Sequence, residues 1–197
     1  KSESIGFGLG PRINAAGRLE SALIAYQLLA TDDDQEAYRL ARRLQDLNTL
    51  RQELTRTAQE SIRTALNLEM MQSPLIFASG HFQPGIVGLV AGRLTEEFYR
   101  PAIVMEMGDT ESRASCRSIP QFDITGALDE CAGLLVRHGG HAQAAGFTVR
   151  NENIPALQAQ LSEIAARSLE GTALIPTLEI DCELDPADMT LSLAETL

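Results

Sequence analysis

Two arginines and a serine alternate along residues 113–118, which read RASCRS. In an extended strand, alternate side chains point to one face, so Arg113, Ser115 and Arg117 would lie together. A guanidinium group can donate two parallel hydrogen bonds to phosphate oxygens, and a hydroxyl adds a further donor. The segment therefore predicts a phosphate-binding clamp on a strand. An exposed edge strand with ordinary polar side chains is the alternative interpretation.

A glycine-rich stretch at residues 5–18 is the second candidate, and we expect it to be an irregular loop. Its later part, residues 10–18, reads GPRINAAGR and contains Arg12, Asn14 and Arg18. Arginines and an amide beside glycines, which allow close backbone approach, suit an oxyanion or phosphate. The alternative is a helix-entry loop with ordinary surface charge.

The third candidate is Gly139, Gly140 and His141, followed by small residues as far as Gly146. Such a run would let a ligand lie against the backbone, with His141 beside it. A glycine that ends a helix, followed by a packed histidine, is the alternative. A zinc site normally needs three or four protein ligands, so His138 and His141 alone predict no metal site in this chain.

Charge and composition restrict the classes of function. The 197 residues include 16 Lys+Arg against 27 Asp+Glu, a net charge of −11, so bulk attraction cannot hold a nucleic acid. Any binding of a polyanion must therefore depend on a few placed arginines. The three cysteines include no CxxC pair, which favours a reducing cytoplasm over a disulfide scaffold. No apolar run is long enough to predict a membrane-spanning helix.

The elements that would position these residues follow from the spacing of apolar side chains. Steps of three and four predict one long helix over residues 35–69. Strands are predicted at 75–78, 101–105, 113–118, 146–149 and 177–184, and helices at 86–98, 123–137 and 155–170. Alternating strands and helices predict an α/β fold with a mixed sheet flanked by helices and preceded by a long connecting helix.

Several of these segments, in this order along the chain, resemble the DHH phosphoesterase family. The double-glycine–histidine segment is typical of the DHH-associated domain. Two further segments, GPRINAAGR at residues 10–18 and SCRSIP at residues 115–120, narrow the resemblance to the bacterial 5′→3′ exonucleases specific for single-stranded DNA. The segments that carry the resemblance are residues 10–18, 85–88, 100–101, 115–120, 122–123 and 139–146.

The resemblance implies four parts. Residues 1–31 would be the C-terminal remnant of the DHH catalytic domain, and 32–72 the long connecting helix. Residues 73–172 would be the DHH-associated, substrate-binding domain, and 173–197 the start of a truncated OB-fold-like domain. In this family two Mn²⁺ or Mg²⁺ ions are held mostly by the DHH domain, so the fragment itself is expected to hold none and to be inactive alone.

The resemblance also implies roles for the candidate residues. Arg18, Ser115 and Arg117 would hold the 5′-phosphate, and His141 with its two glycines would face the metal centre. The expected partner is single-stranded DNA, in a monomeric protein of the cytoplasm that acts in DNA repair and recombination. Two alternatives stay open: a DHH-family phosphodiesterase of oligonucleotides or cyclic dinucleotides, and a non-catalytic phosphate-binding module. The full predicted phosphate-binding set is Arg12, Asn14, Arg18, Ser115, Arg117, Gly139, Gly140 and His141.

Overall fold

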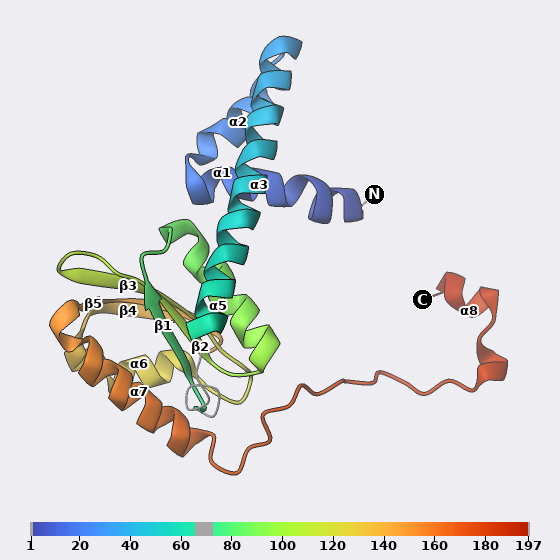
Figure 1. Ribbon diagram of the computed structural model, residues 1–197. Helices are drawn as coiled ribbons and strands as arrows, with labels where there is room; N and C mark the ends of the chain where they lie inside the picture. Colours follow the sequence, from blue (N-terminus) through green and yellow to red (C-terminus); the bar gives the residue numbers. More distant parts are fainter. Residues whose placement is uncertain (1, 66–72, 197) are drawn as a thin grey trace.

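The computed structural model describes residues 2–65 and 73–196, which form a small helical unit, an α/β body and a C-terminal extension (Figure 1). The helices are η1 (Ser4–Leu9), α1 (Gly10–Leu19), α2 (Ala22–Ala30), α3 (Asp34–Ala65), α5 (Pro84–Phe98), α6 (Ile124–Glu130), η2 (Ala132–Leu134), η3 (Asn151–Asn153), α7 (Ile154–Ser168), η4 (Pro186–Asp188) and α8 (Leu191–Thr196). The strands are β1 (Ile76–Gly80), β2 (Ala102–Glu106), β3 (Glu111–Arg117), β4 (Leu135–His141) and β5 (Ala144–Arg150). No described helix is both long and apolar enough to cross a membrane.

The long helix predicted from the apolar spacing is confirmed as α3, although the last predicted residues, 66–69, lie outside the described part of the chain. Asp33 caps its start by accepting hydrogen bonds from the backbone N–H groups of Gln35 and Glu36, at 2.8 and 3.2 Å. Leu44 in its first half packs against α1 and α2, whereas Ile62 near its end packs against α5. The helix therefore contributes to two hydrophobic clusters, and it runs from the small helical unit to the α/β body (Figure 1).

The prediction of an irregular loop over residues 5–18 is wrong, because this stretch is helical throughout. Pro11 occupies the first turn of α1, where a missing N–H is tolerated. Ala15 and Ala16 are fully buried against α2 and α3, so tertiary packing outweighs the low helix propensity of the glycines. Arg12, Asn14 and Arg18 consequently have helical spacing.

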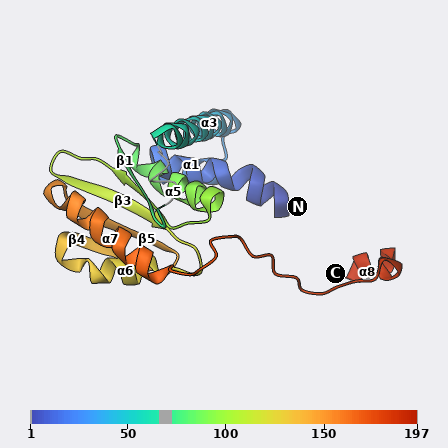
Figure 2. The same cartoon turned by 60° about the horizontal axis from the view of Figure 1, so that its bottom comes forward.

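The mixed sheet is confirmed, with strand order β1-β2-β3-β5-β4. β1 pairs with β2 in parallel, and the remaining pairs are antiparallel. Helix α5 covers one face of β2 and β3, where Val90 packs against Val104 and its neighbours. Helices α6 and α7 cover the opposite face (Figure 2). Strands β5 and β4 lie beyond β3 in the sheet, and His141 at the end of β4 is exposed.

Two predicted elements have different structures. The helix predicted over 123–137 ends at Glu130, and the two glycines belong to strand β4 instead of ending a helix. Pairing of β4 with β5 explains the change: a Cβ at Gly140, which has φ of 154°, would lie 2.4 Å from the Ala144 carbonyl oxygen. The strand predicted at 177–184 is extended and exposed but forms no strand, because no described segment pairs with it.

Candidate phosphate-binding site

The alternation predicted for β3 is confirmed. Arg113 is exposed, and Ser115 and Arg117 are half-buried, whereas the residues between them, Ala114 and Cys116, are buried in the core beneath α6 and α7. The buried face fixes the register of the strand, because a slip of one residue would turn the arginines into the core. Ser115 and Arg117 are therefore held on the face that α5 covers.

A glycine of α5 leaves room for these two side chains. A Cβ at Gly88 would lie 3.1 Å from the Ser115 hydroxyl oxygen and 3.2 Å from a terminal nitrogen of Arg117. The backbone of Arg117 is tied to the same helix, since the Thr95 hydroxyl donates to its carbonyl oxygen at 3.4 Å. Arg117 also donates to the Cys116 carbonyl oxygen at 2.7 Å. Helix α5 and strand β3 together thus set the position of a guanidinium group and a hydroxyl.

Arg18 reaches the same helix from the helical unit. A Cβ at Gly85 would lie only 1.9 Å from the Arg18 carbonyl oxygen, so the end of α1 touches the first turn of α5 directly. The Arg18 side chain donates to the Gly85 carbonyl oxygen at 3.3 Å. Arg18 and Arg117 therefore approach α5 at positions about one turn apart.

A cavity of about 360 Å³ opens beside these contacts, between α3, α5 and the end of β3. We call it the arginine cavity. Arg51 of α3, Arg93 of α5 and Arg117 of β3 line it, and Glu96 is the one carboxylate among its described lining residues. The remaining lining residues are Thr55, Gly88, Leu89 and Gly92. Positive charge from three separate elements is thus brought to one concave surface.

Arg51 carries the clearest electrostatic signal in this cavity. Its Nε is buried and has no hydrogen-bond partner within the described chain. Burial lowers the pKa of Arg51, and the positive charges of Arg18 and Arg93 lower it further. Arg51 is therefore repelled by both neighbouring arginines, and an anion bound beside it would offset this repulsion and accept from its unsatisfied donor.

Sequence reasoning missed Arg51 and Arg93, although Arg51 left a signal. It follows Leu47 by four residues and precedes Leu54 by three, so it lies on the apolar face of α3, where the pattern predicts an apolar residue. An arginine within a buried stripe indicates either a special partner or a binding site. Arg93 left no such signal, because an exposed arginine on a helix is common.

The register of the sheet relates His141 to Arg117. Both residues pair with Ala144, from opposite sides of β5, so their side chains lie on one face with their backbones about 10 Å apart. Gly139 and Ser115 are related in the same way through Gly146. His141 is exposed, and its carbonyl oxygen accepts a hydrogen bond from the Thr125 hydroxyl at 2.8 Å. Strand β4 is also tied to α6, because the Nε2 atom of His138 lies 2.8 Å from the Oδ1 atom of Asp129.

Two predicted residues lie on α1 away from the cavity lining. Arg12 donates to the Gln45 side chain at 2.7 Å and to the Gly8 carbonyl oxygen at 2.5 Å, so it ties α1 to α3. Asn14 is exposed, four residues before Arg18, and therefore shares its face of the helix. Arg12 is turned away from that face by the helical spacing.

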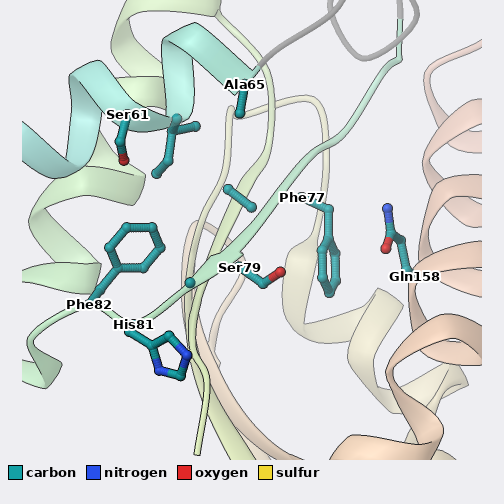
Figure 3. A pocket seen from close by; sticks show the side chains of 10 residues that line it. Ser61, Ala65, Phe77, Ser79, His81, Phe82 and Gln158 are labelled. Carbon is teal, nitrogen blue, oxygen red and sulfur yellow. The ribbon is translucent and has the colours of Figure 1, made fainter.

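A different cavity, of about 520 Å³, lies along the edge strand β1 (Figure 3). Phe82 and Ser61 lie on one side of β1, and Phe77 and Gln158 lie on the other. None of the predicted site residues lines it, and His81 is the one titratable side chain among its described lining residues. It offers no cluster of charged groups for binding phosphate.

Two further kinds of side chain bear on the chemistry of the candidate phosphate-binding site: the cysteine beside it and the possible metal ligands of the described residues. Burial raises the pKa of Cys116 to about 12, so the cysteine between Ser115 and Arg117 is no thiolate nucleophile near neutral pH. Within residues 2–65 and 73–196, no three or more His, Cys, Asp or Glu side chains are grouped so as to hold a metal ion. What the described residues bring together at this site is a set of guanidinium groups and one hydroxyl.

Comparison with known proteins places these features in context. The DHHA1 domain family matches residues 72–167. The single-stranded-DNA-specific exonuclease RecJ of Bacillus subtilis is 38% identical over 197 residues, covering 98% of this chain and 25% of that protein. The RecJ of Escherichia coli is 33% identical over 206 residues, covering 100% of this chain and 36% of that protein.

Solved structures give the same result for the fold. The crystal structure of RecJ from Thermus thermophilus in complex with Mg²⁺ superposes with a TM-score of 0.77 at 34% identity, covering 85% of this chain and 26% of that one. A manganese-bound exonuclease RecJ has the same TM-score at 33% identity, covering 88% of this chain and 44% of that one. The chain thus spans from 25% to 44% of the length of these relatives, which is less than half in every case.

Proposed function

Because the chain belongs to the RecJ proteins and carries their DHHA1 domain, we propose that it is the substrate-anchoring part of a single-stranded-DNA-specific 5′→3′ exonuclease. In this proposal Arg18, Ser115 and Arg117 hold the 5′-phosphate of the strand. His141 and its two glycines then contact the strand farther along the same face of the sheet. Hydrolysis is assigned to the protein as a whole, which would act in DNA repair and recombination in the cytoplasm.

One observation carries the proposal: guanidinium groups from separate elements meet at the small residues of α5, and the described residues around them supply one carboxylate, that of Glu96. A guanidinium group can donate two parallel hydrogen bonds to phosphate oxygens, and a few such contacts can hold a phosphate despite the net charge of −11. A fixed terminal phosphate would also fix how far the next phosphodiester lies from the anchor. Positioning of this kind contributes several kcal/mol to the rate of a well-oriented reaction.

The remaining assignments belong to the same proposal. Residues 1–31 are assigned to the end of the DHH domain, 32–72 to the connecting helix, and 173–197 to the start of an OB-fold-like domain. The relatives whose structures contain Mg²⁺ or Mn²⁺ support a metal-dependent parent protein. A divalent ion pair would supply an activated water and stabilise the leaving oxygen. The described residues of this chain do not form such a centre by themselves, and His141 with Gly139 and Gly140 is assigned to face it.

The proposal is tested by the affinity of this chain for single-stranded oligonucleotides that differ only at the 5′ end. Fluorescence anisotropy is expected to show roughly ten-fold tighter binding of a 5′-phosphate than of a 5′-hydroxyl, because charge-assisted hydrogen bonds are made only to the former. Addition of Mn²⁺ is expected to leave both strands intact. Equal affinity for the two ends, or tighter binding of a cyclic dinucleotide, would contradict the proposal.

A further inference from the structure

We infer that Arg51 and Arg93 form a second phosphate subsite next to the first, so that the arginine cavity takes a strand end bearing two or more linked phosphates. The ligand class is therefore a 5′-diphosphate or 5′-triphosphate end, in addition to the 5′-monophosphate. The inference rests on the proposed function, since it takes Arg18, Ser115 and Arg117 as the holders of the phosphate nearest the strand.

The charge in the cavity exceeds what one phosphate can neutralise. Arg51, Arg93 and Arg117 line it, and Glu96 supplies one opposing charge. Arg18, which is not part of the lining, adds a positive charge that acts on Arg51. A phosphate monoester carries a charge of only about −1.5 to −2 at pH 7. One such group on Ser115 and Arg117 would therefore leave the Arg51–Arg93 side uncompensated. A second, linked phosphate would supply the missing negative charge.

The state of the two side chains supports a ligand over a structural role. Arg51 is half-buried, and its Nε has no partner among the described residues, although a carboxylate or carbonyl normally satisfies a buried donor. Arg93 is exposed at the mouth of the cavity and makes no hydrogen bond or ion pair with any described residue. Arg56 and Arg63 of α3, in contrast, each pair with a glutamate, at 3.1 and 3.0 Å. Arg51 and Arg93 thus differ from these neighbours in that neither makes an ion pair with a carboxylate of the described chain.

The order of elements decides on which side of the first phosphate the second would lie. In the sheet, β5 separates His141 of β4 from Arg117 of β3, and α5, with α3 packed on it, covers the face of β3 and β2 on the side away from β4. A strand held at Arg117 and passing His141 leaves the terminal phosphate facing Arg93 and Arg51. These residues therefore lie beyond the 5′ end, where further linked phosphates would extend. The next internucleotide phosphate would lie on the opposite side.

The test compares three ends on one oligonucleotide: 5′-hydroxyl, 5′-monophosphate and 5′-triphosphate. The chain is expected to bind the triphosphate about ten-fold more tightly than the monophosphate, through added charge-assisted contacts. Arg93→Gln changes an exposed residue, so folding is preserved, and it is expected to lower that advantage to about two-fold or less. Arg51→Gln is expected to have the same effect. Arg56→Gln, which alters a paired arginine on the same helix, is the matched control and should change nothing.

The outcomes separate this inference from the proposed function. The second subsite is contradicted if the triphosphate end binds no more tightly than the monophosphate end, or if Arg93→Gln lowers the affinity for both ends by the same factor. In either case the proposed 5′-phosphate anchor is unaffected. If the monophosphate binds no more tightly than the hydroxyl, the proposed function fails, and the inference fails with it. A selective loss of the triphosphate advantage in Arg93→Gln would establish the subsite.

Discussion

Replacing Arg117 by glutamine is expected to weaken binding of a 5′-phosphorylated single strand by about 10- to 150-fold, the loss of a charge-assisted pair worth about 1.5–3 kcal/mol. Arg117 lies where β3 meets Gly88 of α5, with Ser115 beside it on the same face. Binding of a 5′-hydroxyl strand should change by no more than about two-fold, because that strand has no terminal phosphate. The ratio of the two affinities is therefore the quantity to measure.

Arg113→Gln is the matched control for this variant. Arg113 lies two residues away on the same face of the same strand, but it is exposed and does not line the arginine cavity. Its loss should weaken binding of the 5′-phosphorylated and the 5′-hydroxyl oligonucleotide by the same factor, as expected for a general charge effect. An unchanged affinity ratio in Arg117→Gln, or an equal change of the ratio in Arg113→Gln, would remove Arg117 from the anchor.

Replacing Gly85 by alanine is expected to disrupt the contact between the helical unit and the α/β body. The added Cβ would meet the Arg18 carbonyl oxygen at 1.9 Å, and a backbone atom cannot turn aside as a side chain can. We expect the free energy of unfolding to fall by about 1–3 kcal/mol, the usual effect of overpacking. Because Arg18 would move away from α5, the preference for a 5′-phosphate should fall as well. Urea unfolding and oligonucleotide binding measure the two effects.

Gly92→Ala provides the comparison within the same helix. A Cβ at Gly92 meets no described atom within 4 Å, so this change should keep or raise the free energy of unfolding, by up to about 1 kcal/mol from helix propensity. If Gly85→Ala is as stable as Gly92→Ala and keeps the 5′-phosphate preference, α1 does not position Arg18 through this contact.

The fold was predictable where a local pattern reflects a local cause. The apolar steps that place Leu44 and Ile62 on one side of α3 are visible in the sequence, and so is the alternation of Arg113, Ser115 and Arg117. The strand assignment of Gly139 and Gly140 was not predictable, because glycines usually interrupt structure. Here they form a strand since β5 pairs with them and leaves no space for a Cβ at Gly140.

The site was predictable only in part, for a related reason. Ser115 and Arg117 are neighbours in the sequence, so one strand brings them together. Arg51 and Arg93 belong to different helices and approach each other only through the packing of α3 on α5. Sequence spacing carries no information about that contact. The resemblance to DHH phosphoesterases identified the strand and the glycine–histidine segment, but it did not identify these two arginines.

The central claim is that Arg18 and Arg117, which are 99 positions apart in the sequence, contact one and the same terminal phosphate. The most direct measurement is the NMR spectrum of the arginine side-chain N–H groups during titration with a 5′-phosphorylated oligonucleotide. Signals of Arg18 and Arg117 are predicted to shift together along a single binding curve, while that of Arg167, paired with Glu130 at 2.8 Å, stays in place. Shifts spread evenly over all arginines, or none at Arg18 and Arg117, would contradict the claim.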